Sequence, residues 1–394
     1  MKLVVAIALL AAAPAALAGA AASPGVTAKA VLVGSTGPLT GEAGATAVLR
    51  GADAYFRYVN ARGGVNGRKI TFAVRDDAGD VAQAVENVRA LVEDDAVFAL
   101  FSVVGTDANV AVREYTTPRR VPVVFSAAAA TTLGRDYRRF PYTIGYAPAP
   151  VAEAAVYAAH ALATNRKQAK VAVLYDAREG SGVPGAIRKR LGVNQKVLVK
   201  AVAYDPAASD VATQVRELRA AGANTLLVLV SGPVSVEAVA EAGRLGWKPQ
   251  LYLGGAAAAS AKSMAQRTVE GAISSVVVKD PATPTWAKDR GSMLARRIGT
   301  KYATRAGPTD AGAVAGMAAA YSFVDAVRKA GKTPTRDGLM RAATHMSEAS
   351  NPFLLPGIRV RTTPTSRFPI SQVGLQRREA GRWVLLGGLQ PAPP

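Results

Sequence analysis

The sequence of 394 residues contains no cysteine and only two histidines, His160 and His345. Without cysteine the chain can form no disulfide, so an exported form must be stabilised by its core. For the same reason it is predicted to carry no lipid-modified cysteine. Neither histidine has a cysteine or another histidine at the spacing of a zinc site. Neither is predicted to point into a cleft, as a catalytic triad requires. The sequence therefore predicts no enzyme, no metal and no cofactor.

Acidic residues are also few. The sequence contains 28 acidic and 48 basic residues, which gives a formal net charge of +20. The basic residues are scattered along the chain, and the densest clusters are short, as in Arg188-Lys189-Arg190. This pattern is typical of a solvated, arginine-rich surface. We therefore predict no nucleic-acid partner.

Long apolar runs are missing from the chain except near its N-terminus. Lys2 precedes the apolar run Leu3–Ala13, and Ala16-Leu17-Ala18 then offers the small-residue pattern that signal peptidases recognise. The apolar run is too short for a comfortable membrane span. Residues 1–22 are therefore predicted to be a signal peptide, which places the mature protein in the periplasm. A buried N-terminal helix is the alternative.

Strand and helix patterns alternate through most of the chain. Short apolar or alternating segments are separated by segments of ten or more residues with apolar side chains at helical spacing. This rhythm predicts an α/β fold with parallel, doubly wound sheets. It occurs twice, over about residues 30–145 and 150–278, so we expect two Rossmann-like lobes. The predicted strands are 29–33, 69–75, 97–101 and 121–125 in the first unit and 170–175, 197–204, 225–230 and 250–253 in the second, and 34–44 is predicted to be a glycine-rich turn.

Proline-rich segments interrupt this rhythm at 142–150 and 280–286, where we predict crossovers between the units. Helices are expected after the second crossover, and the tail from Gly357 returns to short strands. A chain that crosses between lobes more than once makes a hinge. The predicted lobes are residues 27–145 plus 281–357 and residues 146–280 plus 358–394.

A set of short motifs occurs in a fixed order along the chain. Gly37-Pro38-Leu39-Thr40-Gly41 follows the first strand, Gly63 to Ile70 leads into the second, and Asp76-Asp77-Ala78 closes it. Gly105-Thr106, Gly246-Trp247-Lys248-Pro249, Leu354 to Ile358 and Thr363-Pro364-Thr365 come later. In this order the set resembles the leucine/isoleucine/valine-binding-protein family of periplasmic solute-binding proteins, over nearly the whole mature chain. The resemblance implies two lobes joined by three crossovers, a ligand in the cleft between them, and a monomer that delivers the ligand to an ABC permease.

The resemblance also implies where a ligand binds. In the first lobe, the turns Val104-Gly105-Thr106 and Ser126-Ala127-Ala128 match turns that hold the ligand carboxylate, which agrees with the positive end of helix dipoles there. For Thr106 and Ser126, a role as helix N-caps is the alternative. In the second lobe, Glu179 stands about where relatives carry a tyrosine, and an exposed loop position is predicted for it. The candidate ligand-binding residues are Leu39, Gly105, Thr106, Ser126, Ala127, Ala128, Glu179, Ser231, Gly255 and Ala256.

One departure from the family pattern bears on the ligand. Amino-acid-binding members carry an acid for the ligand's ammonium group in a turn that here reads Gly254-Gly255-Ala256-Ala257. A buried ammonium without a partner costs several kcal/mol by order of magnitude. Unless Glu179 takes over the pairing, the sequence therefore favours a carboxylate without an amine, aromatic or aliphatic. A branched-chain amino acid or a small amide is the alternative ligand, and an exported ligand sensor on the same fold is the alternative function.

Overall fold

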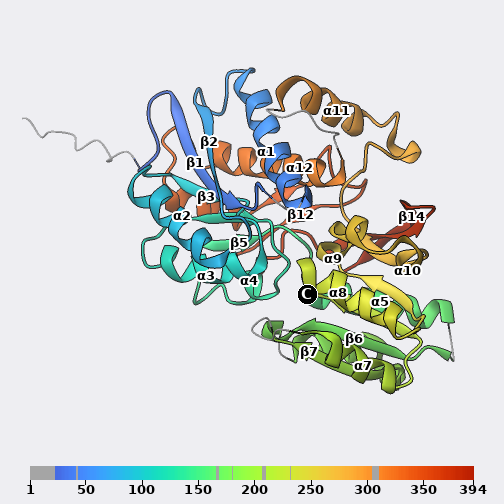
Figure 1. The fold of residues 1–394 in the computed structure, drawn as a ribbon. Coiled ribbons are helices and arrows are strands. Elements are labelled where there is room, and N and C mark those ends of the chain that lie inside the picture. Colours follow the sequence, from blue (N-terminus) through green and yellow to red (C-terminus); the bar gives the residue numbers. More distant parts are fainter. Residues whose placement is uncertain are drawn as a thin grey trace, which may run out of the picture.

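The computed structural model describes residues 23–40, 43–165, 168–179, 181–205, 210–230, 232–303 and 310–394. The predicted signal peptide and Ser231 lie outside the described residues. The strands form two large sheets, each covered by helices, and the two units meet at one end (Figure 1). This arrangement confirms the predicted α/β class with two lobes.

The first sheet has the order β2-β1-β3-β4-β5, and all its pairings are parallel. Its strands are β1 (Ala30–Gly37), β2 (Lys69–Asp76), β3 (Ala99–Phe101), β4 (Val123–Ser126) and β5 (Thr143–Gly145). The predicted turn over 34–44 is wrong in its first part, because Gly34 to Gly37 continue β1 in register with β2. A side chain is not tolerated easily there, since a Cβ on Gly37 would lie 2.8 Å from the Val104 side chain.

Helices cover both faces of the first sheet. Four of them begin at residues whose side chains accept a hydrogen bond from the first turn, as at Asp80, where the Gln83 N–H lies 2.7 Å from the carboxylate. Phe56, Phe101 and Phe323 pack against one another in edge-to-face or tilted contacts between helices and sheet, with centroid distances of 4.9–5.9 Å. The helices are α1 (Ala43–Asn60), α2 (Val81–Glu93), α3 (Thr106–Thr116), α4 (Thr132–Arg135), α11 (Arg290–Tyr302), α12 (Ala311–Lys329) and α13 (Arg336–Ala343).

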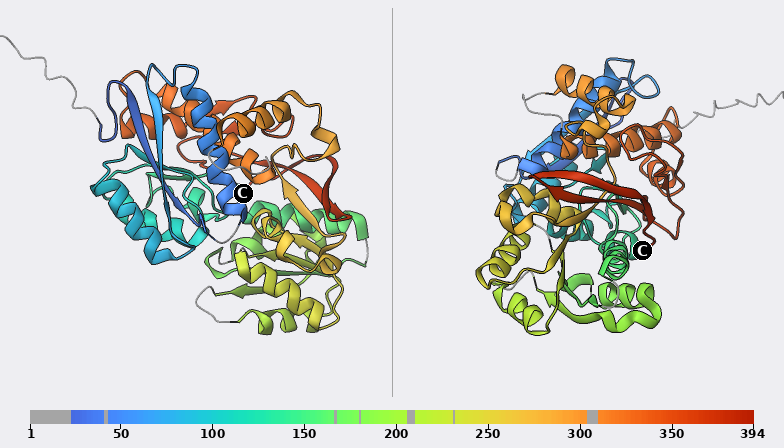
Figure 2. Two further views of the ribbon diagram at one scale, coloured as in Figure 1. Left: turned by 45° about the horizontal axis from the view of Figure 1, so that its top comes forward. Right: turned by 90° about the vertical axis from the view of Figure 1, so that its right-hand side faces the viewer.

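The second sheet has the order β14-β13-β10-β9-β8-β6-β7. Strands β6 (Val171–Asp176), β7 (Leu198–Tyr204), β8 (Thr225–Leu229), β9 (Gln250–Leu253) and β10 (Ile273–Val276) are parallel. The tail adds the hairpin β13 (Gln372–Glu379) and β14 (Arg382–Pro391), whose first strand pairs antiparallel with β10 (Figure 2). The predicted parallel, doubly wound sheet is thus found in β6 to β10, and the hairpin of the tail adds antiparallel pairings at this edge. The two strands of a hairpin run antiparallel to each other, so a hairpin at the edge of a parallel sheet makes the sheet mixed.

The helical segments of the second unit are α5 (Pro150–Asn165), η2 (Ala177–Glu179), α6 (Gly182–Leu191), η3 (Gly192–Val197), α7 (Ala212–Ala220), α8 (Gly232–Arg244), α9 (Gly255–Ala259), η4 (Ala261–Ser263) and α10 (Gln266–Val269). Here η denotes a short 3-10 helix. Among the described residues, none of the helices combines the length and the apolar character that a membrane crossing requires.

The chain passes between the sheets after β5, after β10 and again before β13, which gives the three crossovers. The second contains η5 (Pro284–Trp286), and the third follows a small sheet of β11 (Ser347–Glu348) and β12 (Val360–Arg361). A buried polar cluster joins the first crossover and β11 to α12. Ser322 Oγ lies 2.8 Å from Tyr146 Oη and donates to Glu348 Oε2 at 2.9 Å. The exact residues at which each lobe begins and ends stay a prediction.

Candidate ligand-binding site

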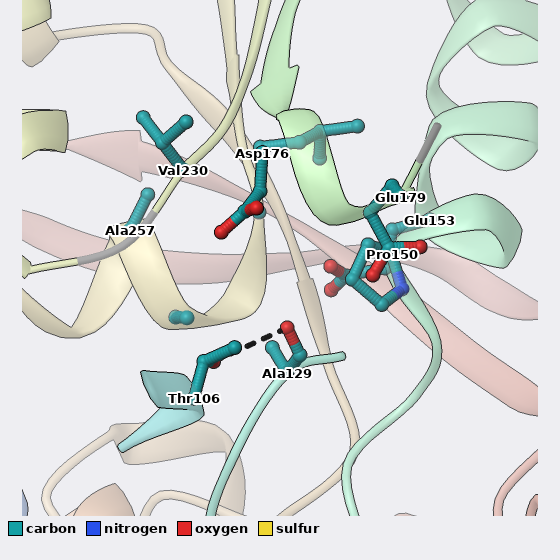
Figure 3. A pocket seen from close by; sticks show the side chains of 11 residues that line it. Thr106, Ala129, Pro150, Glu153, Asp176, Glu179, Val230 and Ala257 are labelled. Atoms are coloured by element: carbon teal, nitrogen blue, oxygen red, sulfur yellow. Dashed lines mark hydrogen bonds between the residues drawn. The ribbon is translucent and has the colours of Figure 1, made fainter. Parts of the chain in front are cut away.

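A pocket lies where the carboxyl ends of the two sheets face one another. Figure 3 shows Thr106 and Ala129 of the first unit across from Asp176, Val230 and Ala257 of the second. The room left for water-sized molecules is about 20 Å³, which suits roughly one water. A larger solute can therefore bind only if the two units move apart and close again. The lining residues are Thr106, Ala129, Pro150, Glu153, Asp176, Glu179, Leu229, Val230, Gly254, Ala256 and Ala257.

The start of α3 forms the wall of the pocket on the first unit. Thr106 is the first residue of this helix, and Gly105 before it has φ +93°, a left-handed conformation that favours glycine. Because glycine has no side chain that could cap the helix, the N–H groups of this first turn can serve a ligand. Helix N-termini attract negative charge. The predicted positions of Gly105 and Thr106 thus agree with a carboxylate site.

The second predicted turn of the first unit lies differently. Ser126 is fully buried at the end of β4, where its Oγ has no hydrogen-bond partner among the described residues. Ala127 pairs with Val104, and the residue of this segment that lines the pocket is Ala129. The N–H of Leu39 donates a hydrogen bond to Asp76 Oδ1 at 2.9 Å, at the edge of the sheet. A ligand contact by Leu39, Ser126, Ala127 or Ala128, as by every other predicted site residue, stays a prediction.

Glu179 lines the pocket, and its predicted exposed position is wrong. The residue is only 3% exposed, because the chain after β6 winds into η2 and turns this side chain inward. The N–H of Thr131, from the opposite unit, donates to Glu179 Oε1 at 2.9 Å. Oε2 is buried and has no hydrogen-bond partner among the described residues. Burial raises the pKa of Glu179, since the charged form is poorly solvated there.

A second pocket carboxylate, Glu153, was missed by the sequence analysis. It lies in the first turn of α5 and is 3% exposed. Its Oε1 accepts hydrogen bonds from the Gly255 N–H at 3.0 Å and from Ser275 Oγ. A Cβ on Gly255 would lie 3.1 Å from the same oxygen. The acid-free turn Gly254 to Ala257 therefore packs against a carboxylate that comes from another element. An acidic residue at a helix start is common, so the sequence carries no signal for this role.

Asp176 is the third carboxylate of the pocket, and it is already paired. The backbone N–H and Nε of Arg178 donate to Asp176 Oδ1 at 2.9 and 2.8 Å, and a further guanidinium nitrogen reaches Oδ2. Arg178 also forms an ion pair with Asp107 in the first turn of α3. Acidic side chains thus outnumber basic ones at the pocket, and Glu153 and Glu179 have no ion-pair partner among the described residues.

The buried glutamates predict how stability depends on pH. Burial raises the pKa of Glu153 and of Glu348 to about 7, compared with 4.5 for an exposed glutamate. The folded protein therefore keeps protons that the unfolded chain has released, so this stabilisation is complete below pH 4.5 and is lost as the pH rises through 7. We expect the free energy of unfolding to fall between about pH 5 and 8, by at most about 3 kcal/mol for each group.

Denaturant unfolding over this pH range checks the expectation. Glu153→Gln and Glu348→Gln should each flatten the profile, whereas Glu86→Gln, whose parent side chain is 69% exposed on α2, should keep the wild-type profile. A wild-type stability that rises from pH 5 to pH 8, with no change in the two buried variants, contradicts it.

The described residues contain no group of three or more histidine, cysteine or carboxylate side chains that could hold a metal ion.

The family model described as periplasmic binding protein matches residues 30–379. The chain belongs to the periplasmic binding protein family. The resemblance to leucine/isoleucine/valine-binding proteins is confirmed by Leu/Ile/Val-binding protein homolog 7 of Brucella suis biovar 1 (strain 1330). It is 30% identical over 214 residues, 52% of this chain and 53% of the relative. The chain thus spans about half the length of the curated relatives it matches.

Solved structures of periplasmic binding proteins share this fold. A branched-chain amino acid ABC transporter protein from Thermus thermophilus with bound valine superposes with a TM-score of 0.71 at 19% identity, covering 92% of this chain and 97% of that one. A solute-binding protein from Rhodopseudomonas palustris BisB5 in complex with 3,4-dihydroxy benzoic acid gives a TM-score of 0.71 at 18% identity, covering 93% and 98%. Because the two bound ligands differ, the fold alone leaves the ligand chemistry open.

Proposed function

We propose that this protein is the periplasmic solute-binding component of an ABC importer, and that its cleft captures a small solute with an amine, preferably an α-amino acid. The observation that carries the ligand class is Glu179, a buried carboxylate with one oxygen unpartnered among the described residues that line the pocket. Such an oxygen costs free energy unless a donor reaches it. A ligand ammonium would supply both the hydrogen bond and the opposite charge.

The surrounding charges support an amine. Arg178 is shared between Asp176 and Asp107, so it offers little to a ligand anion. Arg135 acts on Glu179 only at longer range and forms its own ion pair with Asp136 at 3.2 Å. A ligand without an amine would leave Glu179 unpaired and would bring a further negative charge into the same pocket. The sequence admits an amino acid as ligand only if Glu179 pairs with its amine. The position of Glu179 in the pocket therefore supports this alternative.

An α-amino acid also has a place for its carboxylate. The uncapped start of α3 at Thr106 lies on the opposite wall of the pocket from Glu179 (Figure 3). A solute with an ammonium and a carboxylate would thus contact both units at once. Ligands that contact both units only in the closed state shift the population toward closure. We further propose that the closed monomer docks on the membrane subunits of an ABC permease.

Thermal unfolding of the protein lacking residues 1–22, with a panel of ligands, tests the proposal. The panel contains leucine, valine, lysine, benzoate, 3,4-dihydroxybenzoate, succinate and acetamide. A ligand at about one hundred times its Kd should add roughly 2.7 kcal/mol to the free energy of unfolding. Stabilisation by amino acids but not by the amine-free acids is expected. Stabilisation by an aromatic or aliphatic acid with no effect of any amine would overturn the ligand class.

A further inference from the structure

Two consecutive residues of η2 reach across the cleft. Arg178 forms its ion pair with Asp107 of α3, and Glu179 accepts the Thr131 N–H just before α4. Both partners belong to the first unit, whereas η2 follows β6 of the second sheet. One short turn thus contacts two separate elements of the opposite unit, at the pocket itself.

The guanidinium of Arg178 connects three parts of the site. One edge is bound to Asp176, which lines the pocket on its own unit, and another nitrogen is bound to Asp107, next to Thr106. A planar guanidinium can hold two carboxylates at once because its five N–H groups point along fixed directions. Opening the cleft must break the contact with Asp107 but leaves the contact with Asp176 intact, since Arg178 and Asp176 lie in the same unit.

We propose that Arg178 is a positioning residue for ligand capture, which holds the start of α3 against the second unit and keeps Asp176 neutralised. This arrangement stabilises the closed cleft and leaves Glu179 to serve the ligand. Arg178 and Asp107 are 30% and 49% exposed at their side chains, so water and salt weaken their attraction. The expected effect is therefore modest, a change of about two- to fivefold in the ratio of closed to open molecules.

Distances between spin labels measure this ratio without any ligand. The chain has no native cysteine. Cysteines can therefore be placed at Glu86 on α2 and at Arg219 on α7, which are exposed positions in the two units. Pulsed electron paramagnetic resonance of the labelled protein then reports closed and open distances. Arg178→Gln and Asp107→Asn should each move molecules to the longer distance, about two- to fivefold, and 1 M NaCl should do the same to the wild type.

A double-variant cycle separates this role from general loss of structure. If the two side chains act through one contact, the double variant should shift the population no further than either single variant. Arg57→Gln is the matched control, because its ion pair with Asp53 at 2.8 Å lies within α1 and does not bridge the units. Asp107→Asn carries the test if Arg178→Gln fails to fold. Unchanged distances in Arg178→Gln and Asp107→Asn, or fully additive shifts in the double variant, overturn the proposal.

The measurement is independent of the proposed ligand. Failure of all amines in the thermal panel would remove the amino-acid proposal and leave the Arg178 result standing. Conversely, an amino acid could bind by way of Glu179 even if Arg178 has no effect on closure.

Discussion

Glu179→Gln is expected to weaken binding of an α-amino acid by about 2–4 kcal/mol, which is roughly 30- to 1,000-fold in Kd. Glutamine keeps an oxygen for the Thr131 N–H but replaces the free Oε2 with an amide group that cannot neutralise an ammonium. The same change removes a buried, poorly solvated charge, so the ligand-free protein should be as stable as the wild type or slightly more stable. Isothermal titration calorimetry and denaturant unfolding measure the two effects, which have opposite signs.

Opposite signs distinguish a binding role from a folding role. If Glu179 only holds the structure together, Glu179→Gln should lower stability and affinity together. Glu86→Gln on α2 serves as the control for a lost carboxylate, because it is exposed and remote from the pocket, and it should change neither quantity. An amino-acid affinity that stays within about threefold of wild type in Glu179→Gln would exclude this residue as the partner of the amine.

Gly316→Ala is expected to destabilise the protein by about 3 kcal/mol or more, and Gly316→Val should prevent folding or come close to it. Helices α1 and α12 approach one another so closely that a Cβ on Gly316 would lie 1.9 Å from the Val48 carbonyl oxygen. Gly51 on α1 has the reciprocal contact, at 1.9 Å from the Ala313 carbonyl oxygen. Both clashes involve backbone atoms, which cannot rotate away, so the two helices would have to separate along their length.

A matched glycine in another helix tests whether packing causes this effect. Gly185 lies inside α6, and a Cβ there would meet no atom within 4 Å. Gly185→Ala should therefore stabilise the protein by about 0.4–1 kcal/mol through helix propensity and a less flexible unfolded chain. Melting temperatures of Gly316→Ala and Gly185→Ala should move in opposite directions. A stabilising Gly316→Ala contradicts the packing argument.

The predicted elements were most accurate where the pattern was long and regular. Strand β8 was predicted at 225–230 and found at Thr225–Leu229, because a strand buried on both faces leaves a continuous apolar run. Helix α4 and strand β5 were missed, since four and three residues are too short to show a periodicity. The predicted turn over 34–44 failed because glycine indicates a turn locally, whereas β1 uses Gly34 and Gly37 for close packing in the sheet.

The candidate site also contains residues that the sequence predicted and residues that it did not. The ordered motifs were enough to indicate the family, and this resemblance together with the strand–helix order placed Gly105 and Thr106 at a turn before a helix. The positions of the acidic side chains in the pocket could not be predicted from these signals. Glu179 looked exposed because its neighbours are polar, and only the turn of η2 buries it.

The sequence by itself determined the family, the α/β alternation and the two units, because periodicity and short motifs are properties of neighbouring residues. The chemistry of the pocket was decided by the tertiary structure. Glu153 reaches the Gly255 N–H from 102 residues away, and Arg178 meets Asp107 from the other unit. Such contacts depend on where the sheets and helices place distant segments. The sequence around each partner therefore does not predict them.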